Sequence, residues 1–553
     1  MAKAAELEHV PTAETPKKAS AWAPFGYKAF AILWIATVVS NVGTWMHDVG
    51  AGWLMTELNP TPTMVAAVQA ATTLPVFLFA LLAGAIADIV DRRLLLISVN
   101  IFMGITAGLL AVLVATNAMT PLLLLIFTFA MGTGAAFMAP AWQAIVPQLV
   151  ERKDLSSAIA LNSMGINVSR AIGPALAGFL IVSAGLAWPF ILNALSVIGI
   201  ICALIWWKPP AAPATALPPE HVSGAIWSGL RYAWNSAPIR ATLVRAAAFF
   251  VFASAYWAML PLIARQVLQG GPSLYGILLA SVGGGAVLGA LILPTLREKL
   301  GTNGSVVFGT LGTAAVLCVF ALVQNPIAAA AASALAGVSW IAVLSSLHVS
   351  AQTALPNWVR ARGLSIFLTI FFGSMAAGSM IWGQIATATS IPTALLIAAA
   401  GITLFVPITW TAKLGQGEAM DLTPSSHWPE PVVSDGLEDT GGLVMIQILY
   451  TVPAQNHAAF RAAIGEYAKA RRRSGAYGWS LMQDAEAPDR FIETWFEPSW
   501  TDHLRHHGRV TEEDRKLEHA VRSHLAEGTK AEVRHYLTAA DKPHTHIEKE
   551  NLK

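Results

Sequence analysis

The sequence predicts an all-α polytopic membrane protein with twelve transmembrane helices in a six-plus-six pseudo-repeat, followed by a soluble α+β domain. Three observations favour this fold class. Of the 553 residues, 55% are hydrophobic and 12% are charged, whereas soluble proteins usually carry about 25% charged residues. Residues 29–412 contain only eight of the 33 acidic residues, and residues 413–553 contain 22. The third observation is a series of uncharged stretches of membrane-spanning length.

These stretches give the number of spans, because a helix needs about 20 apolar residues to cross a bilayer. Four stretches have room for one span and four have room for two: 29–47, 58–87, 246–264 and 266–296, then 94–150, 155–207 (interrupted by Arg170), 300–359 and 363–412. Seventeen Lys and Arg residues lie in the N-terminal tail and the loops on one side, and only Arg265 lies in loops on the other. This bias predicts that both termini are cytoplasmic.

Composition also predicts the domain boundaries. The N-terminus is polar and rich in Pro, Ala and Lys, which favours disorder. The predicted divisions are a cytoplasmic tail at 1–23, a six-helix bundle at 24–207, a cytoplasmic central loop at 208–238, a second bundle at 239–412, a linker at 413–441, a cytoplasmic α+β domain at 442–540 and a tail at 541–553.

The two predicted bundles share a short internal repeat. Residues 143–156 align with residues 352–365, and both segments follow the fourth span of their half; the recurring residues are Gln143, Pro147, Val150, Leu155 and Ser156, which return as Gln352, Pro356, Val359, Leu364 and Ser365. A duplicated plan of this kind predicts a substrate site near the membrane midplane between the halves, with alternating access.

Charges gather in the loop after the second span, and the motif residues are Gly84, Asp88, Asp91, Arg92 and Arg93. Charge pairs here could latch neighbouring helices in one state of a transport cycle, or the basic residues could be an anchor without a gating role.

The fifth span carries Gly173, Pro174 and Gly178. Small residues let helices approach closely and proline permits a kink, so this segment predicts either a conformational element or ordinary tight packing.

The chain resembles the major facilitator superfamily in these segments. Its loop signature has glycine, aspartate four residues later, and then a basic pair, as in residues 84–93. Residues 169–178 are similar to the exporter motif of the superfamily, with Ser169 and Ala177 where glycines are usual. Thr128 stands where a second exporter motif has an arginine associated with proton handling.

The amino-acid sequences of residues 43–55 and 355–363 resemble those of the bacterial branch of the superfamily that contains the enterobactin exporter. The resemblance implies a secondary transporter in the bacterial cytoplasmic (inner) membrane that exports a small-molecule substrate, siderophore-like or drug-like, using the proton gradient. An importer of a small nutrient with the same fold, and a membrane-tethered enzyme acting through residues 442–540, are the alternatives.

Titratable residues inside the predicted spans are the candidates for a substrate or proton pathway, because charges are costly there and usually face a cavity. Helix-length counting places Asp48 about 30 Å, and Arg170 about 24 Å, from the cytoplasmic ends of their spans. We expect them to pair, or to share a vestibule with His47; alternatively Asp48 ends a helix among headgroups. His348 is a further candidate, or a packing residue.

Residues 442–540 predict the strand and helix order β-α-β-β-α-β, which is the ferredoxin-like plan. The strands are expected at 443–452, 477–484, 489–498 and 531–537, and the helices at 456–474 and at 499–525 with a break at Gly508. The segment resembles the antibiotic-biosynthesis-monooxygenase-like group of dimeric α+β barrels, which implies self-association. Residues 471–473 predict an exposed helix end or a lipid contact. His503, His506 and His507 predict either a metal site or a solvated, histidine-rich helix face, and the solvated face is the favoured interpretation.

Several chemistries find no support in the sequence. It shows no phosphate-binding loop, no metal-ligand cluster and no nucleophile triad, so we predict no cofactor, no metal and no enzymatic activity. Transport energy would then come from a gradient. The net charge of +2 does not indicate a nucleic-acid partner. The expected partners are the lipid bilayer, the proton gradient and the small-molecule substrate.

Overall fold

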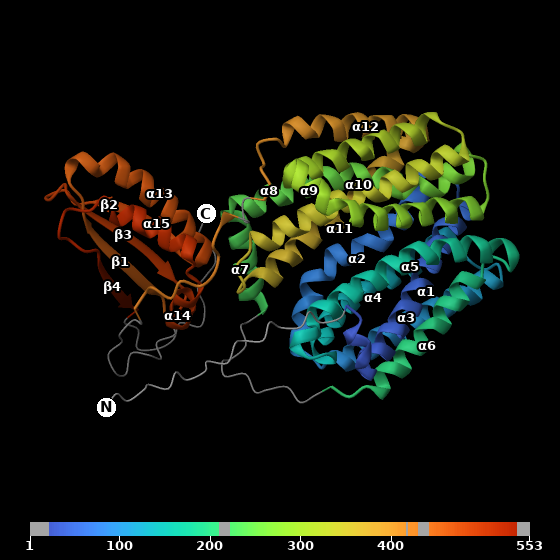
Figure 1. Cartoon of the computed structure of the whole chain (residues 1–553), viewed down its shortest axis with the longest axis horizontal. Coiled ribbons are helices and arrows are strands. Elements are labelled where there is room, and N and C mark those ends of the chain that lie inside the picture. Colours follow the sequence, from blue (N-terminus) through green and yellow to red (C-terminus); the bar gives the residue numbers. More distant parts are fainter. Residues whose placement is uncertain (1–20, 210–221, 416–418, 430–441, 539–553) are drawn as a thin grey trace, which may run out of the picture.

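The computed structural model describes residues 21–209, 222–415, 419–429 and 442–538. The predicted tails therefore lie almost entirely outside the described residues, as do parts of the predicted central loop and linker. A helical bundle makes up most of the described chain, and a small sheet domain lies at one end of it (Figure 1). We call this end of the bundle the near end and the opposite end the far end.

The first half of the bundle contains six long helices, in agreement with the predicted spans. They are α1 (Lys28–Leu58), α2 (Pro62–Ile89), α3 (Arg92–Ala115), α4 (Pro121–Leu149), α5 (Leu155–Ser183) and α6 (Trp188–Trp206). Proline stands in the first turn of α2, α4 and α6, where a helix needs no backbone N–H donor. The Thr120 hydroxyl accepts a hydrogen bond from the Leu123 backbone N–H and caps α4.

The second half follows a shorter helix, α7 (Val222–Asn235), which forms inside the predicted central loop. Its long helices are α8 (Ala237–Leu262), α9 (Pro272–Leu322), α10 (Pro326–Thr353), α11 (Arg360–Ala388) and α12 (Ile391–Ile408). A π-helical turn at Ile263–Val267 extends α8. The described residues contain eleven helices long and apolar enough to cross a membrane, one fewer than the twelve spans predicted.

The difference arises in α9, whose 51 residues cover two predicted spans. Gly301 has φ 67° and ψ 178°, a backbone conformation that is not helical and that favours glycine. The parts of α9 on either side of it pack on the same stretch of α10, since Gly289 approaches Val338 and Gly309 approaches the Ser339 carbonyl. The chain therefore reverses its direction at Gly301, although hydrogen bonding continues through the turn.

The sheet domain has one four-stranded antiparallel sheet in the order β2-β3-β1-β4. Its elements are β1 (Val444–Thr451), α13 (His457–Ser474), β2 (Tyr477–Gln483), β3 (Arg490–Glu497), α14 (Trp500–Arg509), α15 (Glu512–Arg522) and β4 (Glu532–Leu537). One face of the sheet is buried with α13, around Ile446, Phe460 and Trp495. The predicted helix 499–525 breaks after Arg509 and not at Gly508, because Thr511 and Asp514 form a capping box that starts α15.

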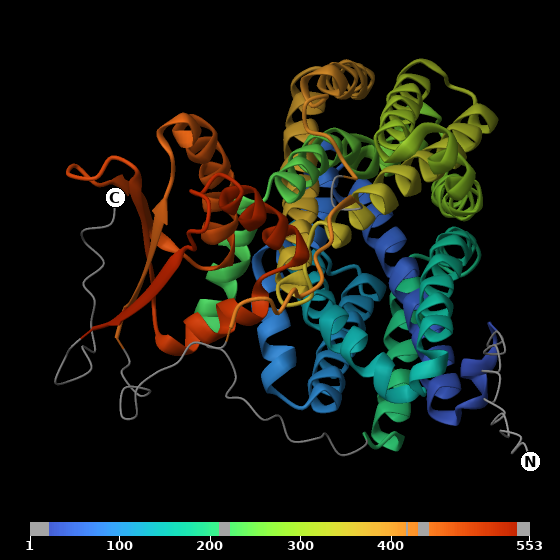
Figure 2. The ribbon, with the colours of Figure 1, turned by 60° about the vertical axis from the view of Figure 1, so that its left-hand side comes forward.

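The two halves of the bundle meet mainly along two helix pairs, α2 with α11 and α5 with α9, and α2 also contacts α8. The sheet domain contacts the bundle through α7, which packs against both α13 and α11 (Figure 2). Arg231 of α7 donates a hydrogen bond to the Gly475 carbonyl (3.2 Å). Arg509 of α14 lies over the ring of Trp358, in the loop between α10 and α11, at 4.4 Å. The domain is therefore fastened at the near end of the second half.

We predict that Gly285→Ala destabilises the protein, whereas Gly284→Ala does not. A Cβ atom at Gly285 would lie 1.9 Å from the Ala334 carbonyl oxygen of α10, and a Cβ atom at Gly284 would meet nothing within 4 Å. Overpacking typically costs about 1–3 kcal/mol. Thermal unfolding of the detergent-purified variants measures the effect, with Gly284→Ala as the control. Equal melting temperatures for the two variants would contradict the close packing of α9 on α10.

Candidate functional site

A cavity of about 250 Å³ lies between the two halves of the bundle. Its polar lining residues are Asp48, Gln69, Thr72, Thr73 and Arg170, and its aromatic ones are Trp45, Trp257, Tyr275, Trp340, Phe371 and Phe372. Seven helices contribute: α1, α2 and α5 from the first half and α8 to α11 from the second. An apolar and aromatic wall with a few convergent polar groups is typical of a small-molecule site.

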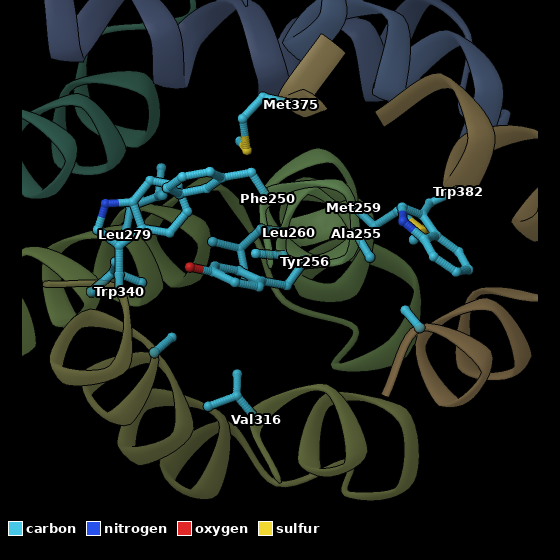
Figure 3. Close-up of a cluster of buried hydrophobic side chains, with 14 of the residues drawn as sticks. Phe250, Ala255, Tyr256, Met259, Leu260, Leu279, Val316, Trp340, Met375 and Trp382 are labelled. Carbon is cyan, nitrogen blue, oxygen red and sulfur yellow. The ribbon is translucent and has the colours of Figure 1, made fainter. Parts of the chain in front are cut away.

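The hydrophobic core of the second half supports one wall of the cavity. Trp340, Leu279 and Met375 belong to the buried cluster shown in Figure 3 and also line the cavity. The Trp340 ring packs against Phe250, with their centroids 5.3 Å apart. The indole N–H of Trp382 is bonded to the Val251 carbonyl (2.7 Å). The aromatic wall is therefore held by packing from several helices.

Asp48 and Arg170 both line the cavity, as their predicted depth indicated. No ion pair joins them among the described side chains, so the structure shows the shared cavity of the second expectation and not the ion pair of the first. The Arg170 guanidinium carbon lies 5.4 Å from the ring centroid of Trp45, three residues before Asp48 on α1. The indole therefore takes the place beside the guanidinium.

Two side-chain donors of the lining lack a hydrogen-bond partner. They are Nε of Arg170 and Nε1 of Trp257, which are both buried and have no partner within the described part of the chain. Both line the same cavity, one from each half. Because an unsatisfied buried donor costs about 1–3 kcal/mol, acceptor atoms of a ligand would be stabilised here.

His47 does not belong to the cavity, which corrects the expectation that it shares a vestibule with Asp48. Consecutive residues on a helix point about 100° apart. His47 is 1% exposed and packs edge-on against Phe190 of α6 at 5.0 Å. His348 also lies outside the lining: its ring nitrogen is 2.9 Å from the Gln352 amide, and its ring packs on Phe367.

Contacts between the halves gather on the far side of the cavity. Arg265, the one basic residue of the sparsely charged loops, donates a hydrogen bond from Nη1 to the Thr56 hydroxyl (2.9 Å). The Thr63 backbone N–H donates to the Thr387 hydroxyl (3.0 Å), which joins α2 to α11. These bonds link the end of α1 and the start of α2 to the second half.

The Gly-Pro segment of α5 lies in the same region. A Cβ atom at Gly173 would lie 2.5 Å from the Trp45 Cβ of α1. A Cβ atom at Gly178 would lie 2.9 Å from the Pro272 carbonyl oxygen at the start of α9, and one at Gly276 would lie 2.6 Å from that of Pro174. The small residues therefore allow close backbone contact between α5 and α9, across the interface of the two halves.

The charged loop at 84–93 fastens helix ends within the first half. Asp91 accepts a hydrogen bond from the Leu94 backbone N–H (2.9 Å) and caps α3. Arg93 donates hydrogen bonds to the backbone carbonyls of Leu204 (2.7 Å) and Ile205 (2.6 Å), in the last turn of α6. Arg92 donates to a backbone carbonyl of α2 (3.2 Å). A Cβ at Gly84 would meet nothing within 4 Å, and the Asp88 side chain lies outside the described parts.

The arginines at the end of α13 are not an exposed helix end, so that prediction is wrong for two of them. Arg471 is 4% exposed, and its guanidinium lies between the rings of Tyr467 and Trp495, at 4.3 and 4.2 Å. Arg473 is also buried and pairs with Asp514 of α15. Aromatic rings and acidic partners allow these charges to be buried.

The predicted solvated histidine face is wrong for two of its three residues, because His503 and His506 are each 2% exposed, whereas His507 is half-buried. Both ring Nδ1 atoms contact the carboxylate of Glu497, at 2.9 and 2.5 Å. Burial alone would raise the pKa of Glu497, but His506 and His503 hold it below its usual range. Burial, and then the neighbouring histidines, lowers the pKa of His507 to about 4.

Comparison with known proteins identifies a matching protein family. A sequence model described as "Transmembrane secretion effector" matches residues 19–544. The staphyloferrin A transporter of Staphylococcus aureus is 25% identical over 264 residues, which are 47% of this chain and 65%, less than two thirds, of that protein. The enterobactin exporter EntS of Escherichia coli is 25% identical over 342 residues, which cover 61% of this chain and 80% of EntS.

Solved structures show the same fold at lower identity. A bacterial homologue of the human lysosomal transporter Spinster, in an inward-facing and unoccupied conformation, is 14% identical with a TM-score of 0.54, covering 70% of this chain and 95% of that chain. The nucleoside transporter NupG is 12% identical with a TM-score of 0.53, covering 69% of this chain and 98% of that chain.

Proposed function

The chain belongs to the transmembrane secretion effector family, a family of membrane transporters and not of enzymes, and from this membership we propose that it exports small molecules across the bacterial cytoplasmic membrane. The observation that supports this most is the cavity that holds Asp48 and Arg170 between the two halves. A site at the interface of two six-helix halves is where alternating access operates.

We propose a substrate rich in oxygen acceptors and partly aromatic, in the siderophore-like or drug-like class. Arg170 and Trp257 offer donors without a partner in the described structure, and Trp45, Trp340 and Phe371 offer aromatic surfaces. Guanidinium groups suit carboxylate and phenolate oxygens. The relatives named for staphyloferrin A and enterobactin support the siderophore class.

We further propose that Asp48 carries the proton that couples transport to the gradient, and that the Gly-Pro segment is the conformational element. Asp48 is the acidic residue of the cavity lining. Opening the far end requires α5 and α9 to part at Gly178, where the backbones now touch. In the same scheme the 84–93 loop acts in gating by holding α3 and α6 together while the halves rock.

Efflux assays test the proposal. A panel of siderophores and fluorescent drugs is loaded into cells lacking this transporter, and retention is compared with cells producing the wild type, Asp48→Asn, Arg170→Gln or Gly178→Ala. We expect the wild type to lower retention, an uncoupler to abolish the effect, and Arg170→Gln to cut efflux about tenfold or more, since each 1.4 kcal/mol of lost substrate contact is a factor of ten.

The matched control for that assay is His348→Gln, which changes a titratable residue outside the cavity lining and should leave efflux unchanged. Higher accumulation in cells producing the wild type would identify an importer. Full efflux by Arg170→Gln would contradict the cavity as the substrate site. Full efflux by a well-folded Gly178→Ala would contradict the role of the Gly-Pro segment.

We propose twelve spans with both termini in the cytoplasm. The reversal at Gly301 supports a division of α9 into two spans. The excess of Lys and Arg in alternate loops supports the orientation. The sheet domain, the near end of the bundle and the turn at Gly301 would then all face the cytoplasm.

Cysteine labelling tests this topology. Cys202 and Cys318 are first replaced by Ala, and single cysteines are then placed at exposed positions 118, 153 and 299. An impermeant maleimide added to intact cells should label Ala118→Cys but neither Lys153→Cys nor Lys299→Cys until the cells are opened. Labelling of Lys299→Cys from outside would contradict the twelve-span division, and labelling of Lys153→Cys would reverse the orientation.

We also propose that the sheet domain is ferredoxin-like and that it self-associates. The strand order β2-β3-β1-β4, with helices between β1 and β2 and between β3 and β4, supports the fold. The face opposite α13 carries Met445, Leu449, Ile492, Phe496 and the 41% exposed Tyr536, an apolar surface that a second copy could cover.

Light scattering of the detergent-purified protein should give the mass of a dimer, and a mass of one chain at every concentration would contradict self-association.

A further inference from the structure

We propose that His503, His507 and His535 form a binding site for a divalent transition metal ion in the sheet domain. One ring nitrogen from each histidine lies within 4.8 Å of the others. The ring centroids of His503 and His507 are 4.8 Å apart, and those of His503 and His535 are 4.7 Å apart. Neither the membrane cavity nor the transport scheme uses these residues.

The fold brings the three side chains together from two elements. His503 and His507 are four residues apart on α14 and therefore share one face of the helix. His535 lies on β4, where it is paired with Ile446 of β1, so its side chain is on the buried face of the sheet. Trp500 packs against both His503 and His535, at 5.1 and 5.8 Å between ring centroids, and forms a wall of the site.

His503 is held in the orientation that a ligand requires. A carboxylate only accepts hydrogen bonds, so the 2.9 Å contact between Glu497 Oε2 and Nδ1 places a proton on Nδ1. The opposite nitrogen, Nε2, is buried and has no partner among the described residues. A carboxylate behind a histidine that presents its other nitrogen is the arrangement found in many zinc sites.

The ligand set selects the class of metal. Three imidazoles suit Zn²⁺ and its transition-metal neighbours, whereas Ca²⁺ and Mg²⁺ prefer oxygen ligands. Zn–N bonds of about 2.0–2.1 Å in a tetrahedral site put the nitrogens about 3.3–3.4 Å apart. Side-chain rotations that move the ring nitrogens by about 1 Å would bring them to this spacing. His507 and His535 are half-buried, which leaves a fourth position for water or a further ligand.

The location of the site links it to the bundle. Arg509, two residues after His507 on α14, lies over Trp358 in the loop between α10 and α11. That loop belongs to the internal repeat at 352–365. Metal bound to α14 would therefore stiffen the helix that contacts the near end of the second half.

Metal binding to the full-length protein tests the proposal. The protein is purified in detergent with a tag that contains no histidine, stripped with a chelator, and titrated with ZnCl₂, and bound zinc is counted after dialysis. We expect one zinc per chain for the wild type, and at least tenfold weaker binding for His507→Ala and for His535→Ala. Replacing Zn²⁺ by Co²⁺ should give the visible absorption of a tetrahedral site in the wild type only.

Two control variants locate the ion. His519→Ala changes an exposed histidine on α15, and a second variant replaces His544 and His546 near the C-terminus by Ala; both should keep the wild-type affinity. A wild-type protein that keeps less than one zinc per chain, or a His544 and His546 variant that loses its zinc, would overturn the proposal.

Further variants separate binding from folding. His507→Gln preserves the size of the side chain, so its melting temperature without metal should match that of the wild type, while the rise on adding ZnCl₂ should be lost. Glu497→Gln changes a positioning residue and should weaken zinc binding about 10- to 100-fold. Equal zinc-induced rises in the wild type and His507→Gln would show a packing cluster and not a metal site.

Discussion

The cost of placing a charged side chain in hydrocarbon is the constraint on which the rest of this structure depends. A charge at the centre of a bilayer costs at least about 2.5 kcal/mol, so Asp48 and Arg170 require an enclosure inside the protein. The two halves provide it, with Trp45 beside the guanidinium and the cavity around both residues. The α5–α9 and α2–α11 contacts join the two halves that surround the cavity. The aromatic core of the second half supports one wall of the cavity.

Much of the bundle could be predicted because membrane spans must be long, apolar and uncharged. Ten of the eleven long helices agree with single predicted spans, and the exception depends on one residue. Arg297, Glu298 and Lys299 predict the end of a span here. The conformation of Gly301 could not be predicted, because glycine tolerates both a helical φ and a φ of 67°. The helix α7 was missed for another reason: its tryptophans and small residues stand in a loop, and it is held by packing against α13 and α11.

The site was predictable in depth but not in direction. Counting residues along α1 and α5 placed Asp48 and Arg170 about 30 and about 24 Å from the cytoplasmic ends of their spans, since the helical rise is constant. Counting does not give the rotation of a helix, and His47 consequently faces Phe190 while Asp48 faces the cavity. The aromatic lining was missed because tryptophan and phenylalanine are common throughout membrane helices. The burial of Arg471 was missed because its partners, Tyr467 and Trp495, are brought to it only by the folded sheet domain.

One physical rule connects the membrane cavity with the sheet domain. A buried polar atom without a partner destabilises the folded state, and a site that binds a ligand can keep such an atom because the ligand completes its bonding. Arg170 and Trp257 keep donors of this kind in the lining of the cavity. His503 keeps the opposite kind, because its Nδ1 contacts Glu497 and its buried Nε2, without a partner among the described residues, is left as an acceptor. The imidazoles of His507 and His535 lie nearby. This difference in polarity is the reason for proposing a substrate rich in oxygen acceptors at the first place and a metal cation at the second.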